Sequence, residues 1–386
     1  MLIWLLSAGN FVVGMGAFVV VGLLPPIASG FGIGADQAGW LMTAYALAYA
    51  IGSPLGVALT GRLPRRWLMS AALGGFGAAA ALSALAPSFD TLLAARVLAA
   101  LSAGLFTPIA AAVAAAQAPP AARGRILARV FFGLTLAQVL GVPTGAYVAH
   151  VAGWRAAFAL VALLAIPLSL ALWRRIPADL AFQPTALRAL AAALSDGRAM
   201  LAVSFTAFFM AAIYTLYTYL APLLQAGMGF DGATVSLALL IFGFGAVAGN
   251  LLGGVLGDRL GPARTLTLLA GTQVVLMPTF ALLPLPLTAL WALLFLWSVF
   301  GWSFMAPQQM RLIALAPERQ AVLLALNAAA IYVGAAIGGA VGGWTLGGAG
   351  ALALGPVAGA LGLIPLGVLW ASARLEFAID KAHLSR

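Results

Sequence analysis

The chain contains no cysteine, a single lysine and few charges of either sign. With no Cys among its 386 residues, disulfide bonds, iron–sulfur clusters and thiol catalysis are all excluded. Charged residues make up only 7% of the chain and hydrophobic residues 64%, which leaves too little polar surface to cover a soluble globule. The composition is therefore that of a membrane protein.

Signatures of the common enzyme classes are also absent. The sequence has no His-Glu-x-x-His, no Gly-x-Ser-x-Gly and no carboxylate pair within an apolar run, so we expect neither an enzyme nor a metal or other cofactor. The only lysine, Lys381, belongs to no glycine-rich phosphate loop, which argues against direct use of ATP by this chain.

Apolar runs of membrane-spanning length follow one another along the chain. A helix needs about 20 apolar residues to cross the hydrocarbon. Helices are expected because an open sheet would leave edge amides unpaired in lipid, and the runs are too continuous for barrel strands. We predict an all-α membrane protein with twelve transmembrane helices, at residues 2–28, 38–59, 67–86, 91–117, 130–149, 156–173, 199–224, 233–256, 265–283, 287–306, 321–346 and 351–371.

The net charge of +10 is explained by where the basic residues lie. All of them except Arg96 and Arg155 fall in loops, or in the tail, on one side of the predicted membrane. Cytoplasmic loops carry such an excess. We expect a monomeric multi-pass protein of a bacterial-type inner membrane, with both termini in the cytoplasm, lipid around it and no nucleic-acid partner.

Landmarks of the first half recur in the second half at one fixed offset. Such repeats enclose the central site of many secondary transporters. We predict two pseudo-symmetric six-helix bundles at residues 1–173 and 199–372, a cytoplasmic linker at 174–198 with a short amphipathic helix over 187–194, and a cytoplasmic tail at 373–386. The residues that recur 198 positions later are Gly56, Arg66, Gly141 and Gly145, which match Gly254, Arg264, Gly339 and Gly343.

The turn between the eighth and ninth predicted spans carries the most specific motif. It runs from Gly254 through Asp258, Arg259 and Gly261 to Arg264, and it resembles the signature loop of the major facilitator superfamily. The resemblance implies a twelve-helix transporter fold in which this loop latches the cytoplasmic face. From the residues alone, a simple turn cap is the alternative.

The equivalent loop of the first half keeps the basic cluster but not the acid. Thr60 stands where the family usually has Asp, so gating is expected mainly from the second copy. We expect membrane topology and contacts with lipid headgroups to explain most of the arginines here. The residues of this loop that we assign to gating are Gly56, Arg62, Arg65 and Arg66.

Arg96 is the one ionisable residue that the sequence places clearly inside a span. A guanidinium in lipid costs at least about 2.5 kcal/mol on insertion scales, so we expect Arg96 to face the bundle interior and to mark a substrate or proton path. The alternative is that it snorkels to the outer interface. Its counterpart 198 residues later is Leu294, so the two halves differ at this position.

The fifth span contains Gly141, Pro143 and Gly145 after Gly133 and Gln138. This run resembles the antiporter motif of proton-coupled exporters in the superfamily, in particular the sugar-efflux, or arabinose-efflux-permease-like, branch of drug:proton antiporters. Gly and Pro also permit close helix packing and a bend, which is the alternative explanation.

One departure from that branch affects the coupling ion. Ala17 stands where its members often carry Glu, and no Asp or Glu lies inside a predicted span. Coupling to protons would then run through Asp36, through His150 or through competition at Arg96, or it would not exist. An interfacial structural role also fits His150.

The resemblance implies a substrate cavity lined by the first, fourth, seventh and tenth spans. Tyr214 and Tyr217 share one helix face and offer flat apolar surface with hydroxyl groups. Because no fixed negative charge is available to hold a cation, we expect a small neutral or weakly anionic substrate. The candidate substrate-binding residues of these spans and their neighbours are Asn10, Arg96, Gln138, Tyr214, Tyr217, Asn250, Trp302, Gln308 and Asn327.

Two functions follow from these observations. The first is proton-linked export of a drug, sugar or related metabolite by alternating access, which the fifth-span motif indicates. The second is uncoupled, exchange or import transport of a small neutral or anionic metabolite, which the missing carboxylate indicates.

Overall fold

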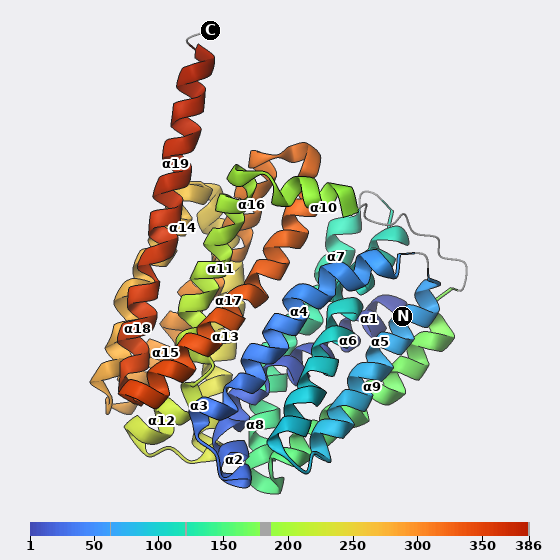
Figure 1. The fold of residues 1–386 in the computed structure, drawn as a ribbon, viewed down its shortest axis with the longest axis vertical. Coiled ribbons are helices and arrows are strands. Elements are labelled where there is room, and N and C mark those ends of the chain that lie inside the picture. The colour runs from blue at the N-terminus through green and yellow to red at the C-terminus, as the bar shows by residue number, and fades with distance from the viewer. Residues whose placement is uncertain (62, 120–121, 178–186, 385–386) are drawn as a thin grey trace. The chain divides into compact units, whose positions relative to one another are not determined.

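Every regular element in the described part of the chain is a helix (Figure 1). The computed structural model describes residues 1–61, 63–119, 122–177 and 187–384. Among these residues, 11 helices are long and apolar enough to cross a membrane, and a bent pair at the N-terminus brings the number of spans to 12. The predicted all-helical membrane fold is therefore confirmed.

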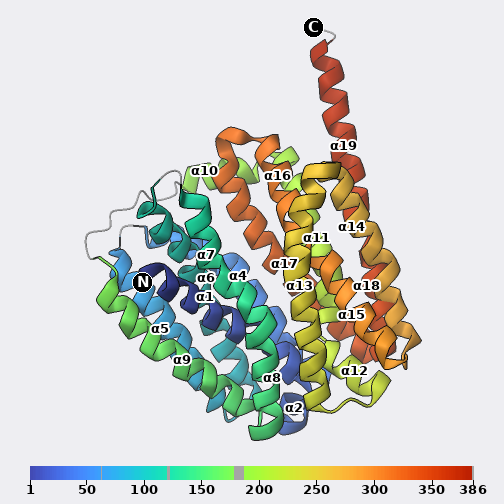
Figure 2. The ribbon, with the colours of Figure 1, turned by 180° about the vertical axis from the view of Figure 1, so that it is seen from behind.

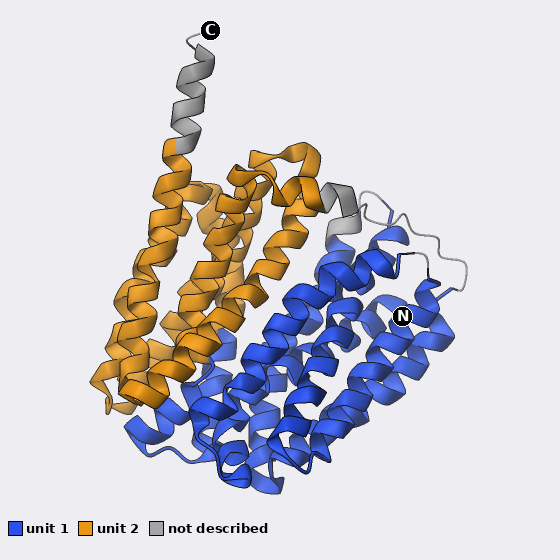
Figure 3. Cartoon of the chain, viewed as in Figure 1, with its two compact units in different colours: residues 1–185, 218–244 blue, residues 186–217, 245–386 orange. Residues whose placement is uncertain are grey.

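Contacts divide the chain into two compact units (Figure 3). Unit 1 comprises Met1–Thr185 and Thr218–Phe244, and unit 2 comprises Ala186–Tyr217 and Gly245–Arg386. The segment Thr218–Phe244 thus packs with unit 1, although it belongs to the second bundle, residues 199–372, that the sequence predicts.

Unit 1 is a bundle in which α4, α6, α5 and α9 lie side by side in that order (Figure 1), and α1 packs against α7 on the other side (Figure 2). Small residues permit these close contacts. The helices are α1 (Leu2–Phe18), α2 (Val20–Phe31), α3 (Ala35–Ala38), α4 (Trp40–Leu59), α5 (Arg65–Ala84), α6 (Phe89–Ala116), α7 (Arg123–Leu136), the π-helix η2 (Ala137–Gly141), α8 (Val142–Ala152), α9 (Trp154–Arg175), α12 (Leu220–Met228) and the first half of α13 (Gly232–Leu260).

The first span is broken, whereas the sequence predicts one continuous helix over 2–28. The chain bends by 43° between α1 and α2. At Val19 the backbone stays in the right-handed helical region, and the Gly22 amide donates to the Val19 carbonyl, three residues back, at 3.0 Å. Because of the break, α1 ends in the middle of the bundle, where its last carbonyl oxygens can accept hydrogen bonds from other helices.

The fifth span also departs from a simple α-helix, because it widens into a π-turn over Ala137–Gly141. The amide of Val142 bonds the carbonyl of Ala137, five residues back. Pro143 explains the widening, because a proline ring clashes with the carbonyl of the fourth residue before it in a regular helix. Such turns are rare and frequent at functional sites.

Unit 2 is built around α11 and α17, which pack along much of their length. Cβ atoms added at Gly334 or Gly338 of α17 would overlap backbone atoms of α11, so these two glycines allow the two helices to pack closely. The helices are α10 (Leu187–Leu194), α11 (Gly197–Tyr217), the second half of α13, α14 (Pro262–Leu276), η3 (Met277–Leu282), α15 (Leu287–Trp302), α16 (Met305–Leu315), η4 (Pro317–Arg319), α17 (Gln320–Ala349), η5 (Ala351–Ala353), α18 (Leu354–Leu361) and α19 (Leu363–Leu384).

The linker helix predicted over 187–194 is α10, with the same bounds. α11 follows it, and Asp196 accepts hydrogen bonds from the backbone amides of Arg198 (3.1 Å) and Ala199 (3.3 Å) at the start of that helix. These bonds hold the pKa of Asp196 below its usual value, and Arg319 adds to the effect through an ion pair at 3.2 Å.

Candidate functional site

Arg96 lies inside unit 1 and contacts the end of α1, next to the break in the first span. It comes from α6, its side chain is 2% exposed, and it donates to the carbonyl oxygens of Gly16 at 2.6 Å and Ala17 at 2.8 Å. Both carbonyls belong to the last turn of α1, where a helix leaves acceptors without intrahelical partners. Arg96 therefore faces the bundle interior rather than the lipid.

Aromatic rings complete the surroundings of the guanidinium. Its carbon lies 4.3 Å from the centre of the Tyr45 ring on α4 and 5.8 Å from that of Phe158 on α9. The negative faces of aromatic rings attract cations. Among the described residues Arg96 forms no ion pair, and its Nε atom has no hydrogen-bond partner.

The carboxyl end of α1 compensates the buried charge. A helix carries about half a negative charge at this end. A guanidinium at the centre of a spanning helix costs about 2.5–3.5 kcal/mol on insertion scales, and hydrogen bonds to charged groups contribute about 1.5–3 kcal/mol each. Two such bonds are enough to keep the cation in place without a carboxylate at position 17.

The glycines of the antiporter-like motif lie against the same break. A Cβ atom added at Gly141 would lie 2.9 Å from the Cβ of Met15. A Cβ atom added at Gly145 would overlap the side chain of Val19. Pro143, between them, is buried in α8. The fifth span can approach the Arg96 acceptors this closely only because these residues lack side chains.

Two further candidates lie along the contact of the first and fifth spans. Asn10 is fully buried in α1 and donates through Nδ2 to the carbonyl of Val130 at 3.1 Å, while its Oδ1 has no partner among the described residues. Gln138 lies in the π-turn, half-buried, and its Oε1 is likewise without a described partner. Both amides thus keep one acceptor available inside the bundle.

Unit 2 holds a separate polar centre made of uncharged groups. Asn327 of α17 accepts from the hydroxyl of Thr206 on α11 at 2.6 Å and from Nε2 of Gln308 on α16 at 3.4 Å. Gln308 also donates to the carbonyl of Ala202 at 2.8 Å. Gln308 and Asn327 were predicted from the sequence as separate candidates, and in the structure they lie together with Thr206. Sequence analysis did not identify Thr206.

The remaining substrate candidates are spread over unit 2. Tyr214 and Tyr217 are buried in α11, with ring centres 5.7 Å apart in an edge-to-face pair. Trp302 is 9% exposed at the end of α15. Asn250 is exposed on α13, so it does not join either polar centre.

The predicted latch is open to solvent or lipid on unit 2. Asp258 and Arg259 end α13 and are exposed, as is Arg264 on α14, and the described residues include no ion pair to any of them. Gly261 has a φ of 80° at the turn between these helices, a value that favours glycine. A Cβ at Gly254 would meet no atom within 4 Å.

In the first-half loop, the arginines contact backbone carbonyls. Arg65 donates to Gly61 at 3.1 Å, and Arg66 donates to Ile176 at 2.9 Å. The Gly56 carbonyl accepts from the Thr60 hydroxyl at 2.6 Å. Arg62 lies outside the described residues.

The two residues considered for proton handling outside Arg96 lie near helix ends, where His150 is exposed and Asp36 is half-buried. His150 is exposed near the end of α8, against Gly232. The neighbouring Asp231 has its pKa lowered chiefly by hydrogen bonds from Thr234, with a smaller contribution from the charge of His150. Asp36 lies in α3.

Sequence analysis missed the partners of Arg96. Its acceptors are backbone carbonyls, which carry no residue signature, and Tyr45 is one aromatic residue among many. The small residues at Gly14, Gly16 and Ala17 were the available signal, because a run of them permits close approach of a neighbouring side chain to the backbone.

Comparison with known proteins agrees with this architecture. The chloramphenicol resistance protein of Streptomyces lividans is 34% identical over 349 residues, 89% of each chain. The uncharacterized MFS-type transporter YbcL of Bacillus subtilis (strain 168) is 31% identical over 341 residues, 88% of this chain and 87% of that protein.

A solved structure shares the fold of this chain, and a family model assigns it to a family. An inward-facing, occupied bacterial homologue of the human lysosomal transporter Spinster superimposes with a TM-score of 0.78 at 17% identity, over 97% of this chain and 96% of that one. The model described as Major Facilitator Superfamily matches residues 6–339. Because this model covers most of the chain and the two relatives are more than 30% identical to it, the chain belongs to the major facilitator superfamily.

Proposed function

We propose that this transporter exports a small neutral or weakly anionic organic molecule across the inner membrane, by alternating access and in exchange for protons. The observation that carries the proposal is the convergence on one break: Arg96 binds the carboxyl end of α1, and Gly141 and Gly145 of the antiporter-like motif pack against the same turn. The similarity to a chloramphenicol resistance protein supports export and a neutral aromatic substrate.

Packing of the segment 218–244 within unit 1 supports alternating access. Tyr219 contacts Gly39, Leu239 lies against Gly22, and Gly243 lies against the backbone of Gln138. We assign these glycine contacts to the closed outer face of the pathway. Residues 1–173 and 199–372 are then the two moving bundles, with the linker 174–198 and the tail 373–386 in the cytoplasm.

A second candidate function is favoured by the chemistry around Arg96. Its partners are carbonyl oxygens and aromatic rings, none of which accepts a proton near neutral pH. This arrangement supports an uncoupled facilitator or exchanger, in which Arg96 holds the first span in shape and attracts a polar or anionic group of the substrate.

Flux through proteoliposomes separates the two functions. Purified protein is reconstituted, and uptake of radiolabelled chloramphenicol is measured with and without an imposed proton gradient. Accumulation above equilibrium that a protonophore abolishes supports exchange for protons. Equal flux with and without the gradient would reject coupling and support the second candidate. Liposomes without protein are the control for leak, and Arg96→Leu, which installs the residue found at the repeat position Leu294, is expected to lower the flux.

A further inference from the structure

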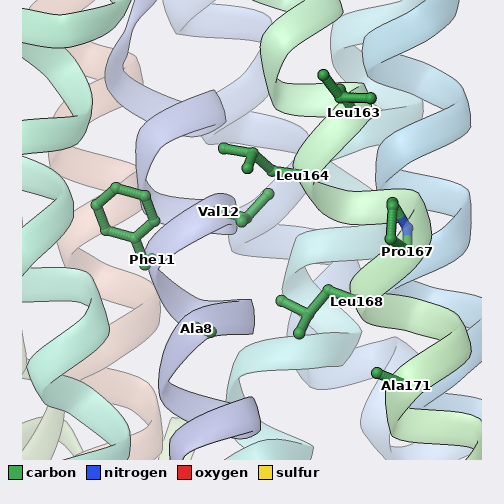
Figure 4. A pocket seen from close by; sticks show the side chains of 8 residues that line it. All are labelled: Ala8, Phe11, Val12, Leu163, Leu164, Pro167, Leu168 and Ala171. Carbon is green, nitrogen blue, oxygen red and sulfur yellow. The ribbon is translucent and has the colours of Figure 1, made fainter.

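An apolar groove of about 440 Å³ runs between α1 and α9 on the surface of unit 1 (Figure 4). Its walls are formed by Ala8, Phe11 and Val12 of α1 and by Leu164, Leu168 and Ala171 of α9, among other apolar side chains. The groove has no polar lining residue, and neither centre of buried polar groups opens into it. It is therefore distinct from the substrate candidates.

Arginines surround one end of this groove. Arg174 and Arg175 lie in the last turn of α9, one turn beyond Ala171, and both are exposed. Nη1 of Arg175 lies 3.5 Å from Sδ of Met1, which places the start of α1 at the same end. Arg66 joins them, since its Nε bonds the carbonyl of Ile176.

No acidic side chain balances these arginines in the described part of this face. The sequences of α1, α5 and α9 contain no Asp or Glu; Asp179 follows α9 outside the described residues. A guanidinium fork matches a phosphate with two parallel hydrogen bonds. Each arginine near an anionic membrane surface contributes about 1 kcal/mol of attraction.

Exposed tryptophans mark the depth of this end in the membrane. Trp4 of α1, Trp67 of α5 and Trp173 of α9 are exposed close to the arginines along their helices, and Trp gathers at the level of the lipid headgroups. From Leu163 to Ala171 the groove follows about 12 Å of helix axis, close to the ~15 Å that one leaflet contributes to a hydrocarbon core of about 30 Å.

We propose that this groove is a binding site for an anionic glycerophospholipid. One acyl chain lies between α1 and α9, and the phosphate lies against Arg174 and Arg175. The length of the groove fits a chain that enters from one leaflet and ends near the bilayer midplane. The net negative charge of the headgroup distinguishes this lipid from the zwitterionic lipids that surround any membrane protein.

Native mass spectrometry tests the site. Delipidated protein in detergent is titrated with dioleoyl-phosphatidylglycerol or dioleoyl-phosphatidylcholine, and retained adducts are counted. We expect retention of phosphatidylglycerol to exceed that of phosphatidylcholine by about threefold or more, the ratio that ~0.7 kcal/mol produces. Arg174→Gln with Arg175→Gln should remove the excess. The matched control, Arg259→Gln with Arg264→Gln on unit 2, should keep it.

A second variant tests the groove independently of charge. Ala171→Trp fills the space between α1 and α9 beside the arginines and should reduce phosphatidylglycerol retention while the arginines remain. Equal retention of the two lipids by the wild-type protein would overturn the proposal, as would unchanged retention in the double glutamine variant or in Ala171→Trp. Thermal melting of each variant, measured in parallel, identifies any that do not fold.

Discussion

Each unit buries polar groups among apolar helices, but the two units stabilise these groups in different ways. Unit 1 buries the charge of Arg96 and binds it to backbone carbonyls of a broken helix. Unit 2 has Leu294 at the corresponding position and instead joins Thr206, Gln308 and Asn327 through neutral hydrogen bonds. The polar groups of the two units therefore differ in kind, as the predicted duplication with divergent sites would require.

Removal of the charge should produce the largest effect. Arg96→Met leaves the Gly16 and Ala17 carbonyls without their donor, and transport should fall at least about tenfold, equivalent to ~1.4 kcal/mol. Arg96→Lys restores charge but not the planar fork, so it should recover only part of the flux. Proteoliposome flux measures both. Full activity of Arg96→Met would show that unit 1 does not depend on its cation.

The next largest expected effect is a loss of stability when a methyl group is added at a tightly packed glycine. In Gly133→Ala, the added methyl group would overlap the backbone carbonyl of Ser7, and neither α1 nor α7 can yield without moving as a whole. We expect a loss of about 1–3 kcal/mol of stability, read as a lower melting temperature.

The matched control lies on unit 2. A methyl group at Gly271 of α14 meets no atom within 4 Å, and alanine favours a helix interior by about 0.5–1 kcal/mol over glycine. Gly271→Ala should therefore melt at the wild-type temperature or above it. Equal destabilisation by the two changes would contradict the close packing of the first and fifth spans.

The neutral centre of unit 2 should be worth less than the charged one. Asn327→Leu removes the acceptor of Thr206 and Gln308, and we expect a loss of about 1–2 kcal/mol, since interhelical hydrogen bonds in membranes average ~0.6 kcal/mol each and reach ~1.7. A double-mutant cycle with Thr206→Val in a denaturation assay measures the coupling. A coupling energy of zero would show that the Thr206–Asn327 hydrogen bond does not contribute to the stability of unit 2.

The smallest expected effect is at Asp196, at the start of α11. Asp196→Ala should cost about 1 kcal/mol as a lost helix cap, whereas Asp196→Asn keeps the cap and loses only the pair with Arg319, worth about 0–1 kcal/mol. Because the folded-state pKa is lowered, the carboxylate stabilises above its unfolded pKa of about 3.9. The advantage over Asn should be constant from neutral to mildly acidic pH and disappear as the pH falls below that value.

The sequence predicts the helices of this fold well because lipid requires long apolar runs, and the distribution of charge exposes Arg96 at once. It does not predict what Arg96 binds, since the acceptors are main-chain atoms. The break at Val19 is hidden in an apolar run, and the π-turn before Pro143 depends on packing that allows the helix to widen. Thr206 escapes notice because a hydroxyl in a helix usually bonds its own backbone.

Use of carbonyl oxygens at Gly16 and Ala17 has a consequence for genetics. Every amino acid supplies the same carbonyl oxygen, so no single replacement at positions 16 or 17 deletes the hydrogen-bond acceptor itself. A side chain added at Gly16 would act through packing instead, because a Cβ there would lie 2.7 Å from the Phe76 ring and 2.9 Å from Val161. Only an alteration of the peptide linkage itself, such as an ester in place of the amide, weakens the carbonyl acceptor directly.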